Sequence, residues 1–300
     1  MSNMCNSTVR FSLILGTVNR VQPLEWMLES LAAQSYVNFE LILVDQNADD
    51  RLGSLVSKWE KQISIVHVRS GTGLSHARNV GATYARGELI GFPDDDCWYP
   101  GDLLSDVSKW FDLNKRFPLL SIGARDEFGS EVASRWPEHS CAITRKNVFR
   151  ACVSFGIFLR KEALIAAGGF DENLGLGSST RFQSGEESDL ALHVIEQAGE
   201  GWFEKSMWAY HPKKDAATAS SHRALTYGAG FGYLLRKHRY PLHSWLYHVL
   251  RALAGAIKAM CGLNSTEALF YWNSARGRFA GYLSAHPVSC KSQHVKPAAQ

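Results

Sequence analysis

The sequence predicts an α/β protein with a mostly parallel sheet flanked by helices, followed by a basic helical extension. Over the first 125 residues, short apolar runs alternate with segments of helical periodicity, a pattern typical of βαβ units. The last 80 residues show helical periodicity alone and an excess of basic side chains. A chain of 300 residues that is 45% hydrophobic and 20% charged has ample material for a core, which excludes a disordered chain.

The first part of the chain contains four predicted strands and the helices that follow them. The predicted strands are Phe11–Gly16, Phe39–Val44, Ile63–Val68 and Glu88–Phe92, and the predicted helices are Pro23–Gln34, Leu52–Lys61 and Ser75–Ala85. The run Leu41–Val44 is apolar at every position, which is typical of a strand that helices cover on both faces.

From about residue 119 the alternation of strands and helices weakens. The next predicted elements are an apolar run at Ala151–Leu159, a helix at Glu162–Ala167, a Gly- and Ser-rich loop at 168–185, a helix at 186–198 and a strand at Trp202–His211. We therefore expect a catalytic-type α/β domain at 1–212, a basic helical extension at 213–288 and a disordered polar tail at 289–300.

The charge distribution and the cysteines indicate the kind of partner and the cellular compartment of the protein. Residues 202–300 carry 13 Lys+Arg and 3 Asp+Glu, a net charge of +10, whereas residues 1–201 sum to −7. This asymmetry indicates an anionic partner for the basic part. The six cysteines form no CxxC pair, and no apolar stretch of about 18 residues is present. The first residues are expected to lead into a strand and not to form a signal peptide. We expect a cytoplasmic protein, with peripheral attachment to the inner face of the cell membrane left open.

Three consecutive aspartates, Asp94, Asp95 and Asp96, directly follow a predicted strand. In an open α/β sheet, ligands bind at the carboxyl ends of the strands. Adjacent carboxylates repel one another unless a cation or hydrogen bonds neutralise them, and hard oxygen ligands suit Mg²⁺ or Mn²⁺. The triplet therefore indicates a metal site, and a solvated acidic turn before the next helix is the alternative.

Further polar residues stand at other strand and helix ends. Asp45 ends the second predicted strand, and Glu186, Glu187 and Asp189 open the predicted helix at 186–198. Acidic residues favour a first helical turn, but three in four positions exceed what a cap needs and indicate a general base. Arg78 follows a Gly-rich turn that lacks the third glycine of a dinucleotide fingerprint, so it is either a phosphate or base ligand or a surface arginine.

Five motifs in one order resemble a family 2 glycosyltransferase of the GT-A fold. They are the first strand with its Thr-x-Asn-Arg turn (Ser12–Arg20), the segment Glu40–Asp45, the ARNxG segment Ala77–Gly81, the Asp triplet in FPDDDCWYP, and GGFDENLG at 168–175 followed by GEESDL at 185–190. Any single motif is weak, but the ordered set spans residues 9–212.

The resemblance implies roles for these positions. The donor-binding residues it implies are Thr17, Asn19, Arg20, Asp45, Arg78, Asp94 and Asp95, with Asp45 at the nucleotide base. Asp94 and Asp96 match the outer residues of the DxD signature, and Asp96, Asp94 and His211 are the implied metal ligands. A structural role is the alternative for His211.

The resemblance also implies a base for catalysis. Where the family has a Glu-Asp pair, this chain has Glu186 and Glu187. Glu187 occupies the place of the catalytic Asp, and the departure leaves the base open between Glu187, Glu186 and Asp189.

The implied function is metal-dependent, inverting transfer of a sugar from a nucleotide sugar. The acceptor would be a hydroxyl of a glycan or of a lipid-linked precursor in surface polysaccharide synthesis, with Mg²⁺ or Mn²⁺ as cofactor. Two alternatives remain: a sugar nucleotidyltransferase, and a catalytically inactive carbohydrate-binding scaffold at the membrane.

The basic extension contains an amphipathic helical pattern at 244–260. Its predicted apolar stripe is Trp245, Leu246, Val249, Leu250, Leu253, Ile257 and Met260, and its predicted polar face is Ser244, His248, Arg251, Gly255 and Lys258. This pattern predicts that residues 240–280 bind an anionic membrane surface, or that the helix packs on the catalytic domain with a solvated basic face. The spacing of three glycines predicts close helix packing at Gly228, Gly230 and Gly232. Nucleic acid is disfavoured, because the aromatic residues fall on apolar stripes.

Overall fold

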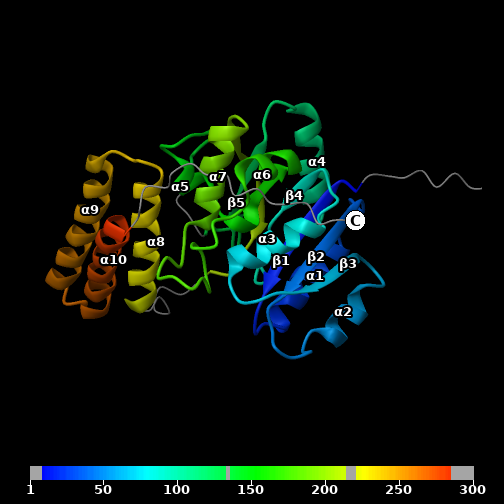
Figure 1. The fold of residues 1–300 in the computed structure, drawn as a ribbon, viewed down its shortest axis with the longest axis horizontal. Helices are drawn as coiled ribbons and strands as arrows, with labels where there is room; N and C mark the ends of the chain where they lie inside the picture. Colours follow the sequence, from blue (N-terminus) through cyan, green and yellow to red (C-terminus); the bar gives the residue numbers. More distant parts are fainter. Residues whose placement is uncertain (1–8, 133–135, 214–220, 285–300) are drawn as a thin grey trace, which may run out of the picture.

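The computed structural model describes residues 9–132, 136–213 and 221–284, so the predicted tail at 289–300 lies outside the described residues. Within them, eight strands form one mixed sheet in the order β3-β2-β1-β4-β7-β5-β8-β6 (Figure 1). Helices flank the sheet, and three long C-terminal helices lie at one end of the molecule. The predicted α/β fold class with a helical extension is confirmed.

The strands and helices have the following bounds. The strands are β1 (Phe11–Thr17), β2 (Phe39–Asp45), β3 (Ser64–Arg69), β4 (Leu89–Gly91), β5 (Leu119–Arg125), β6 (Cys141–Ile143), β7 (Ile157–Arg160) and β8 (Gly201–Tyr210). The helices are α1 (Gln22–Ala32), α2 (Gly53–Trp59), α3 (Leu74–Tyr84), α4 (Leu103–Leu113), α5 (Val148–Ala151), α6 (Lys161–Ala167), α7 (Glu186–Gln197), α8 (Ser221–Lys237), α9 (Leu242–Cys261) and α10 (Ser265–Ser284).

The centre of the sheet sets the position of the polar residues at its edge. β1 pairs in parallel with β2 and β4, and every residue of β2 is buried, as its continuous apolar run predicts. Thr17 is in register with Asp45, so the ends of β1 and β2 present these two side chains at the same edge. The aspartate triplet follows β4 at that edge as well.

The second half of the sheet differs from the sequence prediction. The apolar run 151–159 is not one element, because it contains the end of α5, a 3₁₀ turn at Ser154–Gly156 and most of β7. β7 inserts between β4 and β5 and runs antiparallel to both. The sequence analysis did not identify α4, β5 or β6. Periodicity identifies an apolar run, but the reversal of β7 depends on long-range pairing.

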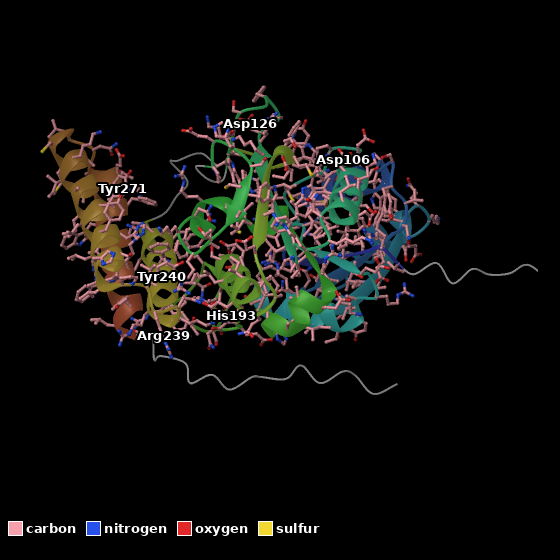
Figure 2. The ribbon with its side chains drawn as sticks, turned by 90° about the horizontal axis from the view of Figure 1, so that it is seen from above. Asp106, Asp126, His193, Arg239, Tyr240 and Tyr271 are labelled. Atoms are coloured by element: carbon pink, nitrogen blue, oxygen red, sulfur yellow. The ribbon has the colours of Figure 1, made fainter. Side chains whose placement is uncertain are left out.

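The C-terminal helices pack closely through glycines, as predicted for Gly228 and Gly232, whereas a Cβ at Gly230 would meet the loop residue Ser184 at 2.4 Å. A Cβ built at Gly232 would lie 2.2 Å from the Arg278 carbonyl oxygen, and one at Gly281 would lie 2.0 Å from that of Ala229. Only glycine permits such backbone contact between α8 and α10. Figure 2 shows these helices beyond α7, at the end of the molecule remote from β1–β3. The predicted boundary between the α/β domain and the helical extension at residue 212 stays a prediction.

The faces of α9 differ from the prediction, because the predicted apolar stripe is divided. Val249 and the small residues Ala252, Ala256 and Ala259 are buried. The large apolar residues instead face outward, with exposed fractions of 45% for Leu246, 53% for Leu250, 59% for Ile257 and 57% for Met260.

Two residues of the predicted polar face lie on the packed side of α9. A Cβ on Gly255 would lie 2.9 Å from the Tyr271 ring of α10, and the His248 ring lies 4.8 Å from that of Phe231 on α8. Arg251 and Lys258 are exposed beside the large apolar residues. Among the described residues, we find no helix with the length and apolarity needed to span a bilayer.

Candidate active site

The aspartate triplet lies at the centre of a polar cluster on the carboxyl edge of the sheet. Thr17 Oγ1, at the end of β1, donates a 2.6 Å hydrogen bond to Asp95 Oδ2, and Arg20 Nη1 lies 2.8 Å from Asp95 Oδ1. Burial raises the pKa of Asp95, although the Thr17 hydrogen bond and the Arg20 charge act to lower it. Asp95 therefore fixes the turn of the triplet to the end of β1.

Asp94 and Asp96 point to different neighbours on either side of Asp95. Arg78 Nη2 donates a 2.9 Å hydrogen bond to Asp94 Oδ1, and the Ser154 hydroxyl lies 3.1 Å from Asp94 Oδ2. Arg20 Nη1 lies 2.7 Å from Asp96 Oδ2. Both outer carboxylates are partly exposed, so these two are the members of the triplet that a ligand can reach.

Arg78 is buried, so the alternative of a surface arginine, which the sequence left open, is wrong. Its side chain is fully buried, and its guanidinium stacks over the Phe170 ring at 5.3 Å. Besides Asp94, its Nη1 lies 3.5 Å from Glu186 Oε1. Within the described residues, its Nε and Nη1 groups have no hydrogen-bond partner. Arg78 is therefore a buried cation that connects Asp94 of the triplet to Glu186 at the start of α7.

Glu186 and Glu187 begin α7 beside this arginine. Burial raises the pKa of Glu186 despite the nearby Arg78 charge. Burial and the adjacent Glu186 charge raise the pKa of Glu187 to about 8. Glu187 remains partly accessible to solvent, whereas Glu186 is buried. Of the two, Glu187 is thus the carboxyl that solvent or substrate can reach.

Asp189, the third candidate on α7, points away from the triplet and toward α8. Its carboxylate lies 2.8 Å from Lys237 Nζ and 2.7 Å from His238 Nε2, and it is completely buried. Burial acts to raise the pKa of Asp189, but the His238 hydrogen bond and the Lys237 charge lower it to about 2. Such a carboxylate is a weak base, and its contacts connect α7 to α8.

His193, which Figure 2 labels on α7, completes a compact group with Asp189 and His238. The three potential ligand atoms lie within 4.8 Å of one another. Lys237 already supplies a positive charge to Asp189 there, so the group has an ionic partner within the chain.

Asp45 forms a second polar cluster at the end of β2. Its Oδ1 accepts hydrogen bonds from the backbone and side chain of Asn47, at 2.9 and 2.7 Å, and His67 Nε2 lies 3.1 Å from Oδ2. Asn47 Oδ1 in turn accepts a 2.7 Å bond from the Asn19 backbone N–H. Asn19 has a φ of 58°, a left-handed conformation that asparagine tolerates. The turn after β1 is therefore tied to the turn after β2.

His211 follows β8 and faces Asp96. Its Nε2 lies 3.5 Å from Asp96 Oδ1, and its Nδ1 lies 2.7 Å from the Pro212 carbonyl oxygen. A carbonyl only accepts, so Nδ1 carries a proton, and Nε2, when it is not protonated, directs its lone pair toward the carboxylate. Two acceptors that face each other suit a cation between them. Carboxylate and imidazole ligands fit Mn²⁺ or Mg²⁺.

Asn47 and Ser154 are among the residues of these clusters that the sequence did not identify. Asn47 stands two positions after Asp45, the spacing at which an amide side chain and its backbone bond a preceding aspartate, so this signal was available. Ser154 reaches Asp94 from 60 residues away through the 3₁₀ turn before β7, and no local pattern indicates it.

Comparison with known proteins identifies the family. Residues 12–165, just over half of the chain, match the family described as glycosyl transferase family 2. The chain belongs to this family.

An uncharacterized glycosyltransferase of Haemophilus influenzae is 26% identical over 192 residues, which are 62% of this chain and 62% of that protein. The poly(ribitol-phosphate) β-N-acetylglucosaminyltransferase TarS of Staphylococcus aureus is 29% identical over 118 residues, 37% of this chain and 20% of TarS. The chain thus spans less than two thirds of the length of these two curated relatives.

Solved structures share the fold of this family 2 member. TarS 1–349 aligns with a TM-score of 0.59 at 15% identity, over 90% of this chain and 91% of TarS 1–349. The same TarS fragment in complex with UDP-GlcNAc aligns with a TM-score of 0.56 at 16% identity, over 90% and 91%. The mannosyltransferase PcManGT of Pyrobaculum calidifontis, in complex with GDP-Man and Mn²⁺, aligns with a TM-score of 0.59 at 17% identity, over 90% and 87%. At such identities the similarity shows a common fold, and it supports the predicted GT-A type.

Proposed function

We propose that this protein transfers a sugar from a nucleotide-sugar donor to a hydroxyl group of a glycan or lipid-linked acceptor, with inversion at the anomeric carbon. The observation that carries the proposal is that the Asp94–Arg78 ion pair has the partly accessible carboxyl Glu187 on one side and, on the other, the Asp96 and His211 pair that suits a divalent cation. A general base and a cation site at one strand edge are what this transfer needs.

The donor occupies the carboxyl edge of β1, β2 and β4. Asp45 binds the nucleotide base, and Thr17, Asn19 and Arg20 shape the turn around it. Arg78, itself fully buried, holds the Asp94 carboxylate on the donor side through its Nη2 group. TarS bound to UDP-GlcNAc and PcManGT bound to GDP-Man support a nucleotide-sugar donor for this fold.

Asp96 and His211 would hold Mg²⁺ or Mn²⁺, with Asp94 on the donor side. The bound cation would neutralise the diphosphate as the leaving group departs. Arg20, which contacts both Asp95 and Asp96, keeps the Asp96 carboxylate at the cation site.

Glu187 is the proposed base that accepts the proton of the attacking acceptor hydroxyl. Its raised pKa makes its carboxylate a stronger base than an exposed glutamate. Glu186 is buried against Arg78 and positions that arginine, and Asp189 is held by α8. These contacts favour Glu187 over both neighbours.

The acceptor is proposed to belong to surface polysaccharide synthesis at an anionic membrane surface. Large apolar side chains of α9 and α10 are exposed, namely Leu246, Leu250, Ile257, Met260, Leu269, Trp272, Phe279 and Leu283. α9 carries Arg251 and Lys258 on its exposed side and no acidic residue. An apolar face beside basic side chains suits a helix that lies in the headgroup region. This arrangement supports peripheral attachment of a cytoplasmic enzyme.

The release of nucleoside diphosphate from a panel of sugar nucleotides with Mn²⁺ tests this function. Activity with one donor, its loss with EDTA, and a loss of more than about 100-fold in Asp96→Asn are expected. Asp106→Asn, an exposed aspartate on α4, is the matched control and retains the rate. A rate that EDTA leaves unchanged would contradict the metal role.

The same assay separates the two alternatives. A sugar nucleotidyltransferase releases pyrophosphate from a nucleoside triphosphate and a sugar phosphate. An inactive carbohydrate-binding scaffold binds glycans but turns over no donor of the panel.

A further inference from the structure

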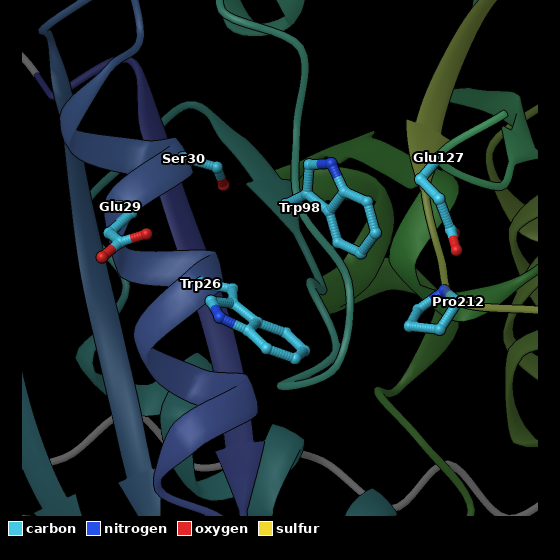
Figure 3. A pocket seen from close by; sticks show the side chains of 6 residues that line it. All are labelled: Trp26, Glu29, Ser30, Trp98, Glu127 and Pro212. Atoms are coloured by element: carbon cyan, nitrogen blue, oxygen red, sulfur yellow. The ribbon is translucent and has the colours of Figure 1, made fainter. Parts of the chain in front are cut away.

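A cavity of about 580 Å³ lies beside the cation site and has no role in the proposed donor binding. It is lined by Trp26, Glu29, Ser30, Trp98, Glu127 and Pro212. Figure 3 shows the indole rings of Trp26, from α1, and Trp98, from the segment after β4, projecting into the same space. Glu127 and Pro212 form the opposite wall. The volume is in the range of small-molecule sites.

Two residues of the cavity wall, Trp98 and Pro212, lie close in the sequence to the proposed cation ligands. Trp98 stands two residues after Asp96, and its backbone exchanges hydrogen bonds of 3.0 and 2.8 Å with Tyr210 on β8. Pro212 follows His211, whose ring faces Asp96. A ligand in the cavity is therefore adjacent to the proposed cation site at Asp96 and His211.

The lining combines fixed aromatic surfaces with unused polar groups. The Trp98 ring stacks on Tyr210 at 5.6 Å with an angle of 15° between the planes, which fixes its orientation. Trp26 is 46% exposed. Among the described residues, the indole N–H groups of Trp26 and Trp98 donate no hydrogen bond. Glu29 and Glu127 form no ion pair with any described residue.

We infer that this cavity binds a sugar ring of the acceptor, and that the ring is neutral or carries an amino group. The apolar C–H face of a pyranose packs on an indole, and its hydroxyls bond to carboxylates and indole N–H groups. The two charged side chains of the lining are carboxylates, which disfavour an anionic polymer by like-charge repulsion. This inference rests on the proposed function, because it names the acceptor class of that reaction.

Saturation-transfer NMR with a panel of methyl pyranosides tests the inference without requiring catalysis. The panel contains neutral glycosides, methyl glucosaminide and methyl glucuronide. At least one neutral or amino sugar is expected to bind, with the glucuronide weaker. Trp26→Ala and Trp98→Phe are each expected to weaken binding about tenfold. Tyr84→Ala, a similarly exposed aromatic on α3, is the matched control.

A kinetic measurement separates this inference from the proposed function. If transfer is observed, Trp26→Ala should raise the acceptor KM about tenfold and the donor KM by much less. Absence of donor turnover with intact pyranoside binding would contradict the proposed function alone. The inference is overturned if no pyranoside binds the wild-type protein, if binding survives Trp26→Ala combined with Trp98→Phe, or if the donor KM rises instead.

Discussion

Two carboxylates on the first turn of α7 have opposite roles, and a pair of amide substitutions separates them. Glu187→Gln removes the proposed base, whereas Asp189→Asn removes the anion that Lys237 and His238 share. The variants alter neighbouring positions of one helix by the same chemical change. Each therefore serves as the control of the other.

The expected loss of activity follows from the role of Glu187. Removal of a general base costs about 10² to 10⁴ in rate. With a pKa of about 8, only about one tenth of Glu187 is ionised at pH 7. Because the ionised form is the base, the wild-type transfer rate should rise with pH and level off above about 8. Glu187→Gln should lose this rise and gain thermal stability at pH 7 and above, since a partly buried carboxyl that resists ionisation is removed.

The expected loss of stability follows from the contacts of Asp189. A pKa of about 2 in place of the ordinary 3.8 corresponds to about 2 kcal/mol of folding free energy at 1.36 kcal/mol per pH unit. Because the folded-state pKa is lowered, this stabilisation is present above pH 3.8 and is lost as the pH falls toward 2. Asp189→Asn should therefore lower Tm by roughly 4–8 °C equally at pH 5 and pH 8.

The assay is transfer rate against pH, with Tm from differential scanning fluorimetry at the same pH values. Asp189→Asn should keep the shape of the wild-type pH profile below its Tm. The reasoning would be refuted if Asp189→Asn lost the pH-dependent rise with Tm unchanged, or if Glu187→Gln transferred sugar at the wild-type rate.

Three further predictions concern the core, the helical extension and its surface. Arg78→Met leaves the buried Glu186 and the partly exposed Asp94 without their cation and should reduce the free energy of unfolding by about 3–5 kcal/mol, and an unchanged denaturation midpoint would refute the buried role. Gly281→Ala should lower stability by about 1–3 kcal/mol, because its Cβ meets a backbone oxygen of α8, whereas Gly262→Ala, with no atom nearer than 3.6 Å, should not. Ile257→Glu should reduce sedimentation with anionic vesicles about tenfold at unchanged Tm, with the exposed Leu113→Glu on α4 as control. The membrane role would be contradicted if Ile257→Glu bound vesicles as well as the wild type did. It would also be contradicted if the wild-type protein were a dimer that Ile257→Glu dissociates.

Much of the fold and of the donor edge could be predicted from local pattern. The continuous apolar run of β2 predicts a doubly covered strand, and polar residues directly after β1, β2 and β4 must meet at one edge of a parallel sheet. The alternation of strands and helices gives the order of the first elements. These inferences need only residues that are near one another in the sequence.

What the sequence could not supply depends on partners distant in the chain. Asp189 is indistinguishable from its acidic neighbours until α8 places Lys237 and His238 against it, 48 and 49 residues away. Periodicity identifies α9 as a helix, but its buried face consists of small residues that fit against α10, so the larger side chains are left outside. The burial of Arg78 likewise depends on Phe170 and α7.

The most direct test of the central claim is the stereochemical course of transfer, followed by proton NMR. With an α-linked nucleotide sugar, Mn²⁺ and a pyranoside acceptor, the account predicts a β-linked product and one equivalent of nucleoside diphosphate. Both should be absent with EDTA or in Asp96→Asn. An α-linked product, or pyrophosphate in place of the diphosphate, would contradict the account.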